Sequence, residues 1–199
     1  MVTTVQLTIR KGSTFLWTLL PETATQKYIP ITAITMTPTG VRLTAASHGL
    51  VEGWCFLISR CKGLTRLNMA DEGSPRASDY FQANVIDADT VEINTSNTTG
   101  DKSYTGGGVL QYGIPMDLIG CVVRAKIIPT EGAKTVTLDI SQYVTISIAA
   151  CRIDIAVPGT ETSLLPGNNL VLGIELEDAT GHVFSLPVIT LVLHEELVK

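Results

Sequence analysis

The strongest constraint on this fold is the alternation of apolar and polar residues along most of the chain. Val, Ile and Thr recur at every second position, and Gly, Pro, Asn and Asp separate the runs. In residues 2–12, Val5, Leu7 and Ile9 fall on one face of an extended strand. Because a two-residue period with β-branched side chains is typical of strands, the pattern predicts an all-β protein.

Strands are expected throughout the chain, with helix in only one short segment. The expected strand segments are residues 2–12, 14–21, two within 28–50, 53–60, 80–94, 105–114, 118–129, 134–140, 143–158 and 169–197. Turns are expected at Pro38–Gly40, Asp87–Asp89 and Asp178–Gly181. Residues 158–166 are compatible with one helical turn capped by Thr160 or Thr162.

The polar surface must consist largely of uncharged side chains. Charged residues make up 17% of the 199 residues, against about 25% in an ordinary globular protein, and there are 26 threonines. Such a surface repels its neighbours weakly and suits a protein packed into an assembly. The net charge is −5, and the densest basic cluster is only Arg60, Lys62 and Arg66. Nucleic-acid binding needs a basic face, so we expect no nucleic-acid partner.

Few features of the sequence indicate the cellular compartment of the protein. No run of about 20 apolar residues is present, and the N-terminal residues lack a basic start followed by an apolar core. We therefore expect no membrane partner and no signal peptide. The four cysteines, Cys55, Cys61, Cys121 and Cys151, form no C-x-x-C pair, which predicts free thiols and no zinc site. Cys121 and Cys151 lie in apolar runs and are expected in the core.

Two zones of different composition divide the chain. Residues 22–114 hold most of the loop-forming Asn, Gly and Asp, whereas residues 115–199 alternate with short turns, as residues 1–21 do. We infer that residues 1–21 and 115–199 form one β-sandwich whose first hairpin carries an inserted domain, residues 22–114. Insertion costs little where the ends of the inserted domain lie close together. The prediction requires residues near 21 and near 115 to be neighbours in space.

No motif in the sequence predicts a reaction. His48 lacks a neighbouring carboxylate and nucleophile, so we expect a turn in which its imidazole bonds to the backbone. Asp87 and Asp89 begin no EF-hand loop, because Glu92 occupies the position of the required glycine. Gly106–Gly108 lacks the lysine and helix of a phosphate loop and predicts a β-edge or turn. We expect no enzyme activity, no catalytic residue, no metal and no cofactor.

Aromatic residues offer the candidate contact sites. Most of them lie within apolar strands, which favours core packing; these are Trp17, Trp54, Tyr80, Phe81 and Tyr112. Tyr28 and Tyr104 are flanked by polar residues and are the candidates for an exposed contact.

The outer parts of the chain resemble the N-terminal domain of bacteriophage baseplate upper proteins. The matching phrases are Arg10–Phe15, Pro115–Ile127, Ile146–Pro158, Leu164–Gly167 and Asp178–Gly181. In that family the two opening phrases are nearly contiguous, whereas about 90 residues separate them here. This departure marks the insertion.

The insert is similar to a small β domain named from ubiquitin-activating enzymes, the first catalytic cysteine half-domain (FCCH), which recurs in phage tail proteins. The matching residues are Ile31–Ile34, Ala46–Leu50, Gly53, Gly63–Thr65, Leu67, Asn68, Asp87–Ile93 and Gly106–Gly108. That domain is not the catalytic centre of its namesake, so the resemblance implies no ubiquitin chemistry. Together the two resemblances imply an Ig-like β-sandwich that carries an inserted small β-barrel.

The resemblances imply a structural component of a bacteriophage virion, and we expect a tail or baseplate adaptor. Its sandwich would dock on other virion proteins, such as the tail hub, baseplate or fibre, and its insert would make a second contact. We expect a homo-oligomer in the assembly and a location in the virion, assembled in the host cytoplasm. Two alternatives stay open: a head decoration or cement protein, and a carbohydrate-binding module on the tail whose insert takes a host glycan.

Overall fold

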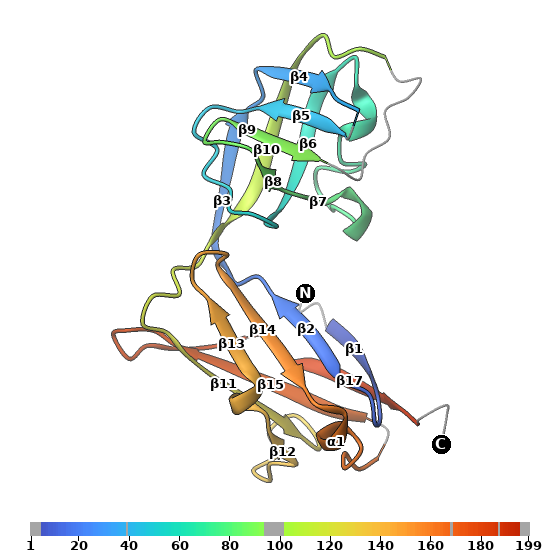
Figure 1. The fold of residues 1–199 in the computed structure, drawn as a ribbon, viewed down its shortest axis with the longest axis vertical. Helices are drawn as coiled ribbons and strands as arrows, with labels where there is room; N and C mark the ends of the chain where they lie inside the picture. The colour runs from blue at the N-terminus through green and yellow to red at the C-terminus, as the bar shows by residue number, and fades with distance from the viewer. Residues whose placement is uncertain (1–4, 39, 94–101, 168, 187, 196–199) are drawn as a thin grey trace. The chain divides into compact units, whose positions relative to one another are not determined.

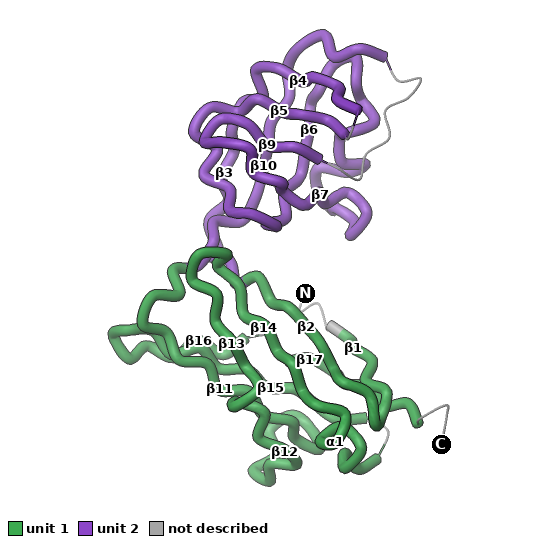
Figure 2. Tube along the Cα trace, viewed as in Figure 1, with its two compact units in different colours: residues 1–20, 117–199 green, residues 21–116 purple. Residues whose placement is uncertain are grey.

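The computed structural model describes residues 5–38, 40–93, 102–167, 169–186 and 188–195, and confirms an all-β protein (Figure 1). The chain forms two compact units (Figure 2). Unit 1 comprises residues 1–20 and 117–199, and unit 2 comprises residues 21–116. The predicted insert, residues 22–114, differs from unit 2 by one residue at its start and two at its end.

Unit 1 contains two sheets. The larger sheet has the order β1 (Val5–Arg10), β17 (Ile189–His194), β15 (Asn169–Glu177), β11 (Val122–Ile128) and β12 (Leu138–Asp139), and β16 (Val183–Ser185) also pairs with β15. The smaller sheet has the order β13 (Val144–Ser147), β14 (Arg152–Val157) and β2 (Phe15–Leu19). Strands β1 and β17 run parallel, and the other pairs are antiparallel. Figure 1 shows the two sheets as two layers.

Alternating burial explains why these segments are strands. On β11, Val123, Ala125 and Ile127 are buried, whereas Val122, Arg124 and Lys126, which alternate with them, are exposed. The same alternation gives buried Leu and Ile side chains along β14, β15 and β17. Each fully buried side chain of this size contributes roughly 1.5–3 kcal/mol. One apolar face per sheet therefore forms the core of unit 1.

One lateral side of unit 1 is closed by the connection from β12 to β13. This connection contains a 3-10 turn, η3 (Ser141–Tyr143), and the fully buried Ile140. The Ile140 N–H donates to the Ala125 carbonyl at 3.0 Å, and the Ser141 hydroxyl accepts from the Ala125 N–H at 3.1 Å. The connection is thus bonded to β11 beside the smaller sheet. On the opposite side, the two sheets end at β1 and β2.

Unit 2 also contains two sheets. The first has the order β3 (Glu22–Pro30), β10 (Gly106–Pro115), β6 (Cys55–Lys62) and β7 (Phe81–Gln82). The second has the order β4 (Ala33–Met36), β5 (Val41–Thr44), β9 (Thr90–Ile93) and β8 (Asn84–Val85). Two 3-10 turns, η1 (Thr65–Leu67) and η2 (Ala77–Asp79), lie between β6 and β7. A closed barrel for this unit and an Ig-like sandwich for unit 1 stay predictions.

The ends of the insert are neighbours, as the predicted insertion required. The Met116 N–H donates to the Pro21 carbonyl at 2.9 Å, and Glu22 pairs with Pro115. The expected hairpin around the insert is wrong, however. Strand β2 precedes the insert and β11 follows it, and these strands belong to different sheets. The short turn after β1 carries the chain from one layer to the other, so β1 and β2 do not pair.

Local hydrogen bonds among the described residues fit the three predicted turns, of which Thr39 in the first lies outside the described residues. The Thr37 N–H donates to the Gly40 carbonyl at 2.8 Å, and the Gly181 N–H to the Asp178 carbonyl at 3.0 Å. In the turn before β9, the Asp89 N–H donates to the Asp87 carboxylate at 2.8 Å. Asp usually favours turns because its carboxylate can accept a hydrogen bond from the backbone N–H two residues later in the chain.

Other expectations need correction. Strand β3 was not predicted before Tyr28, because its exposed polar residues give no alternation. Residues 134–140 contain only the two-residue β12. Helix α1 (Gly159–Thr162) forms, but no side chain caps it. Thr162 lies at its end, where its hydroxyl donates to the Ser13 carbonyl at 2.8 Å.

Replacing residues 22–115 with Gly-Gly is expected to leave unit 1 folded, because Pro21 and Met116 already lie within hydrogen-bonding distance. We expect a strand-type circular dichroism spectrum and one cooperative thermal transition. Adding Ile155→Asp, which places a charge at a buried core position, should abolish that transition in the control. A shortened chain that shows no cooperative unfolding would contradict the assignment of unit 1.

Candidate functional site

The outer face of the larger sheet in unit 1 is the best-developed candidate site. Cross-strand register places its residues in three rows over β11, β15 and β16. The rows are Val122–Glu177–Val183, Arg124–Glu175–Ser185 and Lys126–Gly173. Directly opposed residues share one side of a sheet, so these side chains project together, away from the core. We call these three rows the outer face.

Two valines make this face partly apolar. Val122 is 53% exposed and Val183 is 52% exposed, and they flank Glu177 from opposite sides. The Glu177 carboxylate is paired with the guanidinium of Arg124. An exposed ion pair of this kind contributes about 0–1 kcal/mol. The valines are therefore the larger source of binding free energy if a partner covers the face.

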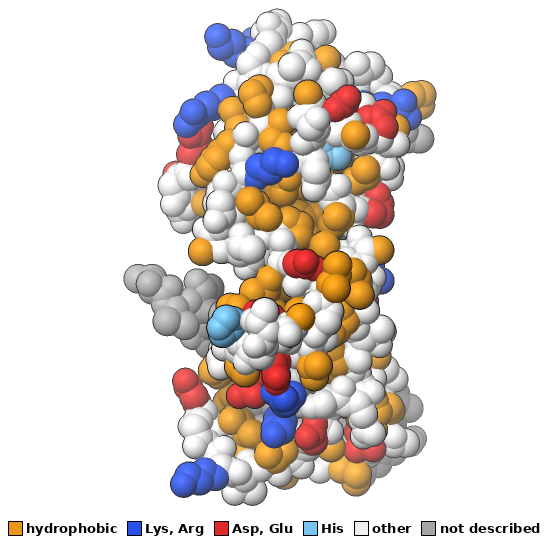
Figure 3. Space-filling view, turned by 90° about the vertical axis from the view of Figure 1, so that its left-hand side faces the viewer, with side chains coloured by type: hydrophobic (Ala, Val, Ile, Leu, Met, Phe, Trp, Pro, Cys, Tyr) orange, Lys and Arg blue, Asp and Glu red, His pale blue; other side chains and the backbone are white. Residues whose placement is uncertain are grey.

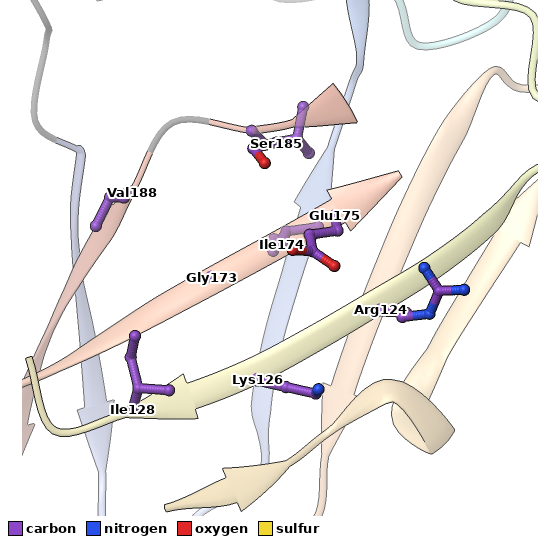
Figure 4. A pocket seen from close by; sticks show the side chains of 9 residues that line it. Arg124, Lys126, Ile128, Gly173, Ile174, Glu175, Ser185 and Val188 are labelled. Atoms are coloured by element: carbon purple, nitrogen blue, oxygen red, sulfur yellow. The ribbon is translucent and has the colours of Figure 1, made fainter. Parts of the chain in front are cut away.

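A hollow of about 250 Å³ lies beside these rows (Figure 4). Its floor includes Gly173, with Arg124, Lys126 and Ile128 along β11 and Ser185 and Val188 beyond β15. Gly173 does not have a positive φ, and a Cβ there would meet only the Lys126 carbonyl oxygen, at 4.0 Å. Neither backbone conformation nor packing within this chain requires a glycine. Glycine weakens a strand, so its use here keeps the hollow open at a cost in stability.

A shift in strand pairing forms one wall of the hollow. Ser185 pairs with Glu175, but Ile189 pairs with Leu172, so the partner of β15 gains one residue between them. The Leu186 N–H bonds to the Ile174 carbonyl at 3.0 Å within this irregular stretch. The segment 183–193 was expected as one strand, and this bulge divides it into β16 and β17. Bulges commonly redirect side chains near binding sites.

The His48 imidazole bonds to the backbone, as predicted. It is 1% exposed, and both ring nitrogens bond to backbone: Nε2 to the Asp87 carbonyl at 2.9 Å, and Nδ1 to the Leu50 N–H at 3.0 Å. Because Nδ1 accepts and the carbonyl requires a donor, the imidazole carries its proton on Nε2. The His48 carbonyl in turn accepts from Lys27 Nζ and the Tyr112 hydroxyl. A shallow pocket of about 310 Å³ adjoins this loop.

The acidic residues between Asp87 and Glu92 form hydrogen bonds or ion pairs within unit 2. Asp89 accepts from the Ser47 N–H at 2.7 Å, and Glu92 is paired with Arg42 at 2.6 Å. Hydrogen bonds from the Asp89 and Thr90 backbone and the Thr90 side chain lower the pKa of Asp87, with a smaller contribution from His48. These contacts fit the predicted hairpin turn.

The two predicted contact tyrosines differ in exposure. Tyr28 on β3 is 61% exposed, and its hydroxyl accepts from Gln111 Nε2 at 3.4 Å. Tyr104 is only half-buried, and its hydroxyl lies 2.7 Å from the Gly107 carbonyl and 3.1 Å from the Ile31 carbonyl. Its polar end therefore bonds inward. Tyr80, expected in the core, is 47% exposed.

Gly106–Gly108 begin β10 and pair with β6, whereas the pairing of β10 with β3 begins only at Val109. The expected β-edge therefore applies to the start of this strand, and the cysteine expectations need a correction. A Cβ on Gly108 would lie 2.6 Å from the Cys61 Sγ, so close packing explains that glycine. Cys121 and Cys151 are half-exposed rather than in the core, and each thiol lies near a backbone carbonyl. The described cysteines are free, and burial raises the pKa of Cys61 to about 11.

Three titratable groups in unit 2 influence one another. Burial raises the pKa of Glu22, Cys55 and Tyr80, and the Glu22 carboxylate raises the other two further. The Glu22 carboxylate covers Gly113, where a Cβ would lie 1.8 Å from Oε2. A thiol with a raised pKa is a poor nucleophile, so this cluster does not resemble an activated cysteine.

The sequence matches no protein-family model, and no curated protein matches it. Within the described ranges, no three His, Cys, Asp or Glu residues gather as metal ligands would. No helix among the described residues has the length and apolar character needed to cross a membrane.

His48→Ala is expected to lower the free energy of unfolding by about 2–4 kcal/mol. The variant leaves the Leu50 N–H and the Asp87 carbonyl without their partners and opens a cavity. Urea unfolding followed by circular dichroism measures this change. His194→Ala removes an exposed imidazole and serves as the control, with an expected change below about 0.5 kcal/mol. Equal effects of the two variants would contradict the structural role of His48.

Proposed function

We propose that this protein is a structural component of a bacteriophage virion, a tail or baseplate adaptor that docks through unit 1. The observation that carries the proposal is the outer face, with its exposed valines and the hollow over Gly173. The insert, unit 2, makes a second contact in the assembly. The sequence resemblance to baseplate upper proteins supplies the class of particle.

The outer face has the composition of a docking surface. Its apolar positions lie beside a hollow of about 250 Å³, a volume that holds one partner side chain such as leucine or phenylalanine. Anchors of this kind, seated in a pocket, supply most of the free energy of protein–protein binding. Arg124, Lys126 and Glu175 surround the hollow with charges of both signs, which fits a polar rim. Covering the two half-exposed valines adds roughly 1 kcal/mol each.

Sparse surface charge supports a position within an assembly. Figure 3 shows one face on which charged side chains are scattered among hydrophobic side chains and other uncharged atoms of side chains and backbone. Few like charges need to be brought together when such a surface packs against a neighbour. The same physics would serve a head decoration protein, so the position in the particle decides between the two roles. Exposed Tyr28 is the observation that favours the carbohydrate-binding alternative.

Antibody labelling of purified particles tests the proposal directly. Gold-labelled antibodies raised against this chain are expected to mark the tail or baseplate in electron micrographs. Label on the head would replace the adaptor role with decoration, and particles without label would overturn a virion role. Parallel assays of host surface polysaccharide binding, with Tyr28→Ala as the matched variant, test the glycan alternative.

Gly173→Val is expected to leave the free energy of unfolding unchanged or raise it by up to about 1 kcal/mol, since valine favours strands. The same variant fills the hollow and should reduce incorporation into particles. Val183→Lys should reduce incorporation as well, whereas Val136→Lys, at a valine of similar exposure outside the outer face, should not. Mass spectrometry of particles assembled in competition with the unaltered chain measures each effect. Equal incorporation of all variants would exclude the outer face from docking.

A further inference from the structure

The open lateral side of unit 1 forms a second groove. It has a volume of about 380 Å³ and runs between β1 and β2, which are the last strands of their sheets. Its lining comprises Leu7–Arg10 and Ser13–Trp17. Apolar side chains form most of its walls, including the 71% exposed Leu16. On the other side, the β12–β13 connection occupies the corresponding position.

Among the described residues, β1 pairs only with β17, so half of its backbone groups have no strand partner there. The Lys11 N–H donates to the His194 carbonyl at 2.9 Å, so odd-numbered residues of β1 bond to β17. Even-numbered residues then direct their N–H and C=O groups away from β17, because successive residues of a strand alternate in this respect. The Arg10 carbonyl accepts from the Ser13 N–H at 3.1 Å. Gln6 and Thr8 keep main-chain donors and acceptors directed at the open side.

We propose that this groove takes an extended strand of another protein, which pairs with β1 at Gln6 and Thr8 and places alternate apolar side chains between the sheets. Only a polypeptide backbone offers donors and acceptors at the spacing of a strand edge. The groove walls match apolar side chains at every second position. Arg10 at one end favours a partner carboxylate there. The inference names the partner chemistry of the docking unit, and it rests on the proposed function for the source of that partner.

Thr8→Pro is the sharpest variant for this site. Proline removes the Thr8 N–H, which faces the open side, and edge strands tolerate proline where that group has no ladder partner. The fold should therefore persist while strand addition is lost. Thr8→Val keeps the N–H and the preference for strand, and is the matched control. Arg10→Gln should weaken binding about two- to fivefold, the range of an exposed ion pair.

The probe is a seven-residue peptide of alternating valine and threonine with one terminal aspartate. It is titrated into the isotope-labelled full chain and followed by nuclear magnetic resonance. We expect saturable shifts of the Thr8 amide and the Trp17 indole, which line the groove. Thr8→Pro should weaken binding at least about tenfold, and Thr8→Val should not. A peptide of the same composition without the alternation should not bind.

A second pair of variants keeps the test independent of any unfolding caused by proline. Leu16→Lys places a charge at the rim of the groove and should weaken peptide binding, whereas Leu164→Lys alters a leucine of similar exposure that does not line it. The absence of shifts at Thr8 and Trp17, or equal effects of these two variants, would overturn the inference. A dimer of the chain alone that Thr8→Pro dissolves would show that a second copy occupies the groove, and would overturn the choice of another protein.

The outcomes separate this inference from the proposed function. If the peptide does not bind but antibodies label tails, the groove inference fails alone. If the peptide binds but particles carry no label, the virion role fails and the strand-binding site stands.

Discussion

The backbone contact between Pro21 and Met116 is the constraint on which the two-unit organisation depends. One N–H···O bond of 2.9 Å, followed by the pairing of Glu22 with Pro115, brings together two residues that have 94 residues between them in the chain. For the fold of unit 1, unit 2 therefore has the same effect as a short connection, because the chain leaves and re-enters at neighbouring residues. Its closing strands, which follow the insert, can then pair with strands that precede it, as β17 does with β1. The first and last strands of unit 1 thus share one sheet.

The sequence predicted the features that depend on local chemistry. Alternation along the strands predicted the all-β class, and the aspartate turns formed as expected because their acceptors lie two residues away. His48 was correctly expected in a backbone-bonded turn, since no partner for catalysis stood beside it. The pairing of strands that lie far apart in the chain was harder to predict from the sequence. The parallel contact of β1 with β17 joins residues about 184 positions apart, as between Arg10 and His194, and no local pattern specifies it.

The candidate site was not predicted, and its physical origin explains why. Gly173 lies in an apolar strand and resembles any other strand glycine in sequence; only its open surroundings and ordinary φ distinguish it. The Leu-Pro-Val phrase at 186–188 is a sequence signal for an interrupted ladder, because proline cannot donate to one, although Pro187 itself lies outside the described residues. For Cys121 and Cys151, the sequence instead led to a wrong prediction. Their apolar neighbours suggest core, but both lie in turns that flank strands, where the chain leaves the sheet.

The two surfaces of unit 1 differ in the kind of partner that they select. The outer face presents side chains, so it selects a partner by the shape and charge of the partner's surface. The groove beside β1 offers backbone, so it accepts strands with little regard for sequence beyond alternation. Proteins usually protect such an edge with lysine, proline or a covering segment. Strand β1 has Gln6 and Thr8 at its outward positions and a single cation, Arg10, at its end. A strand edge that is uncharged along most of its length and lies beside an open apolar groove favours association with other chains. That property is a liability for a free protein and an advantage for one that functions in contact with its neighbours.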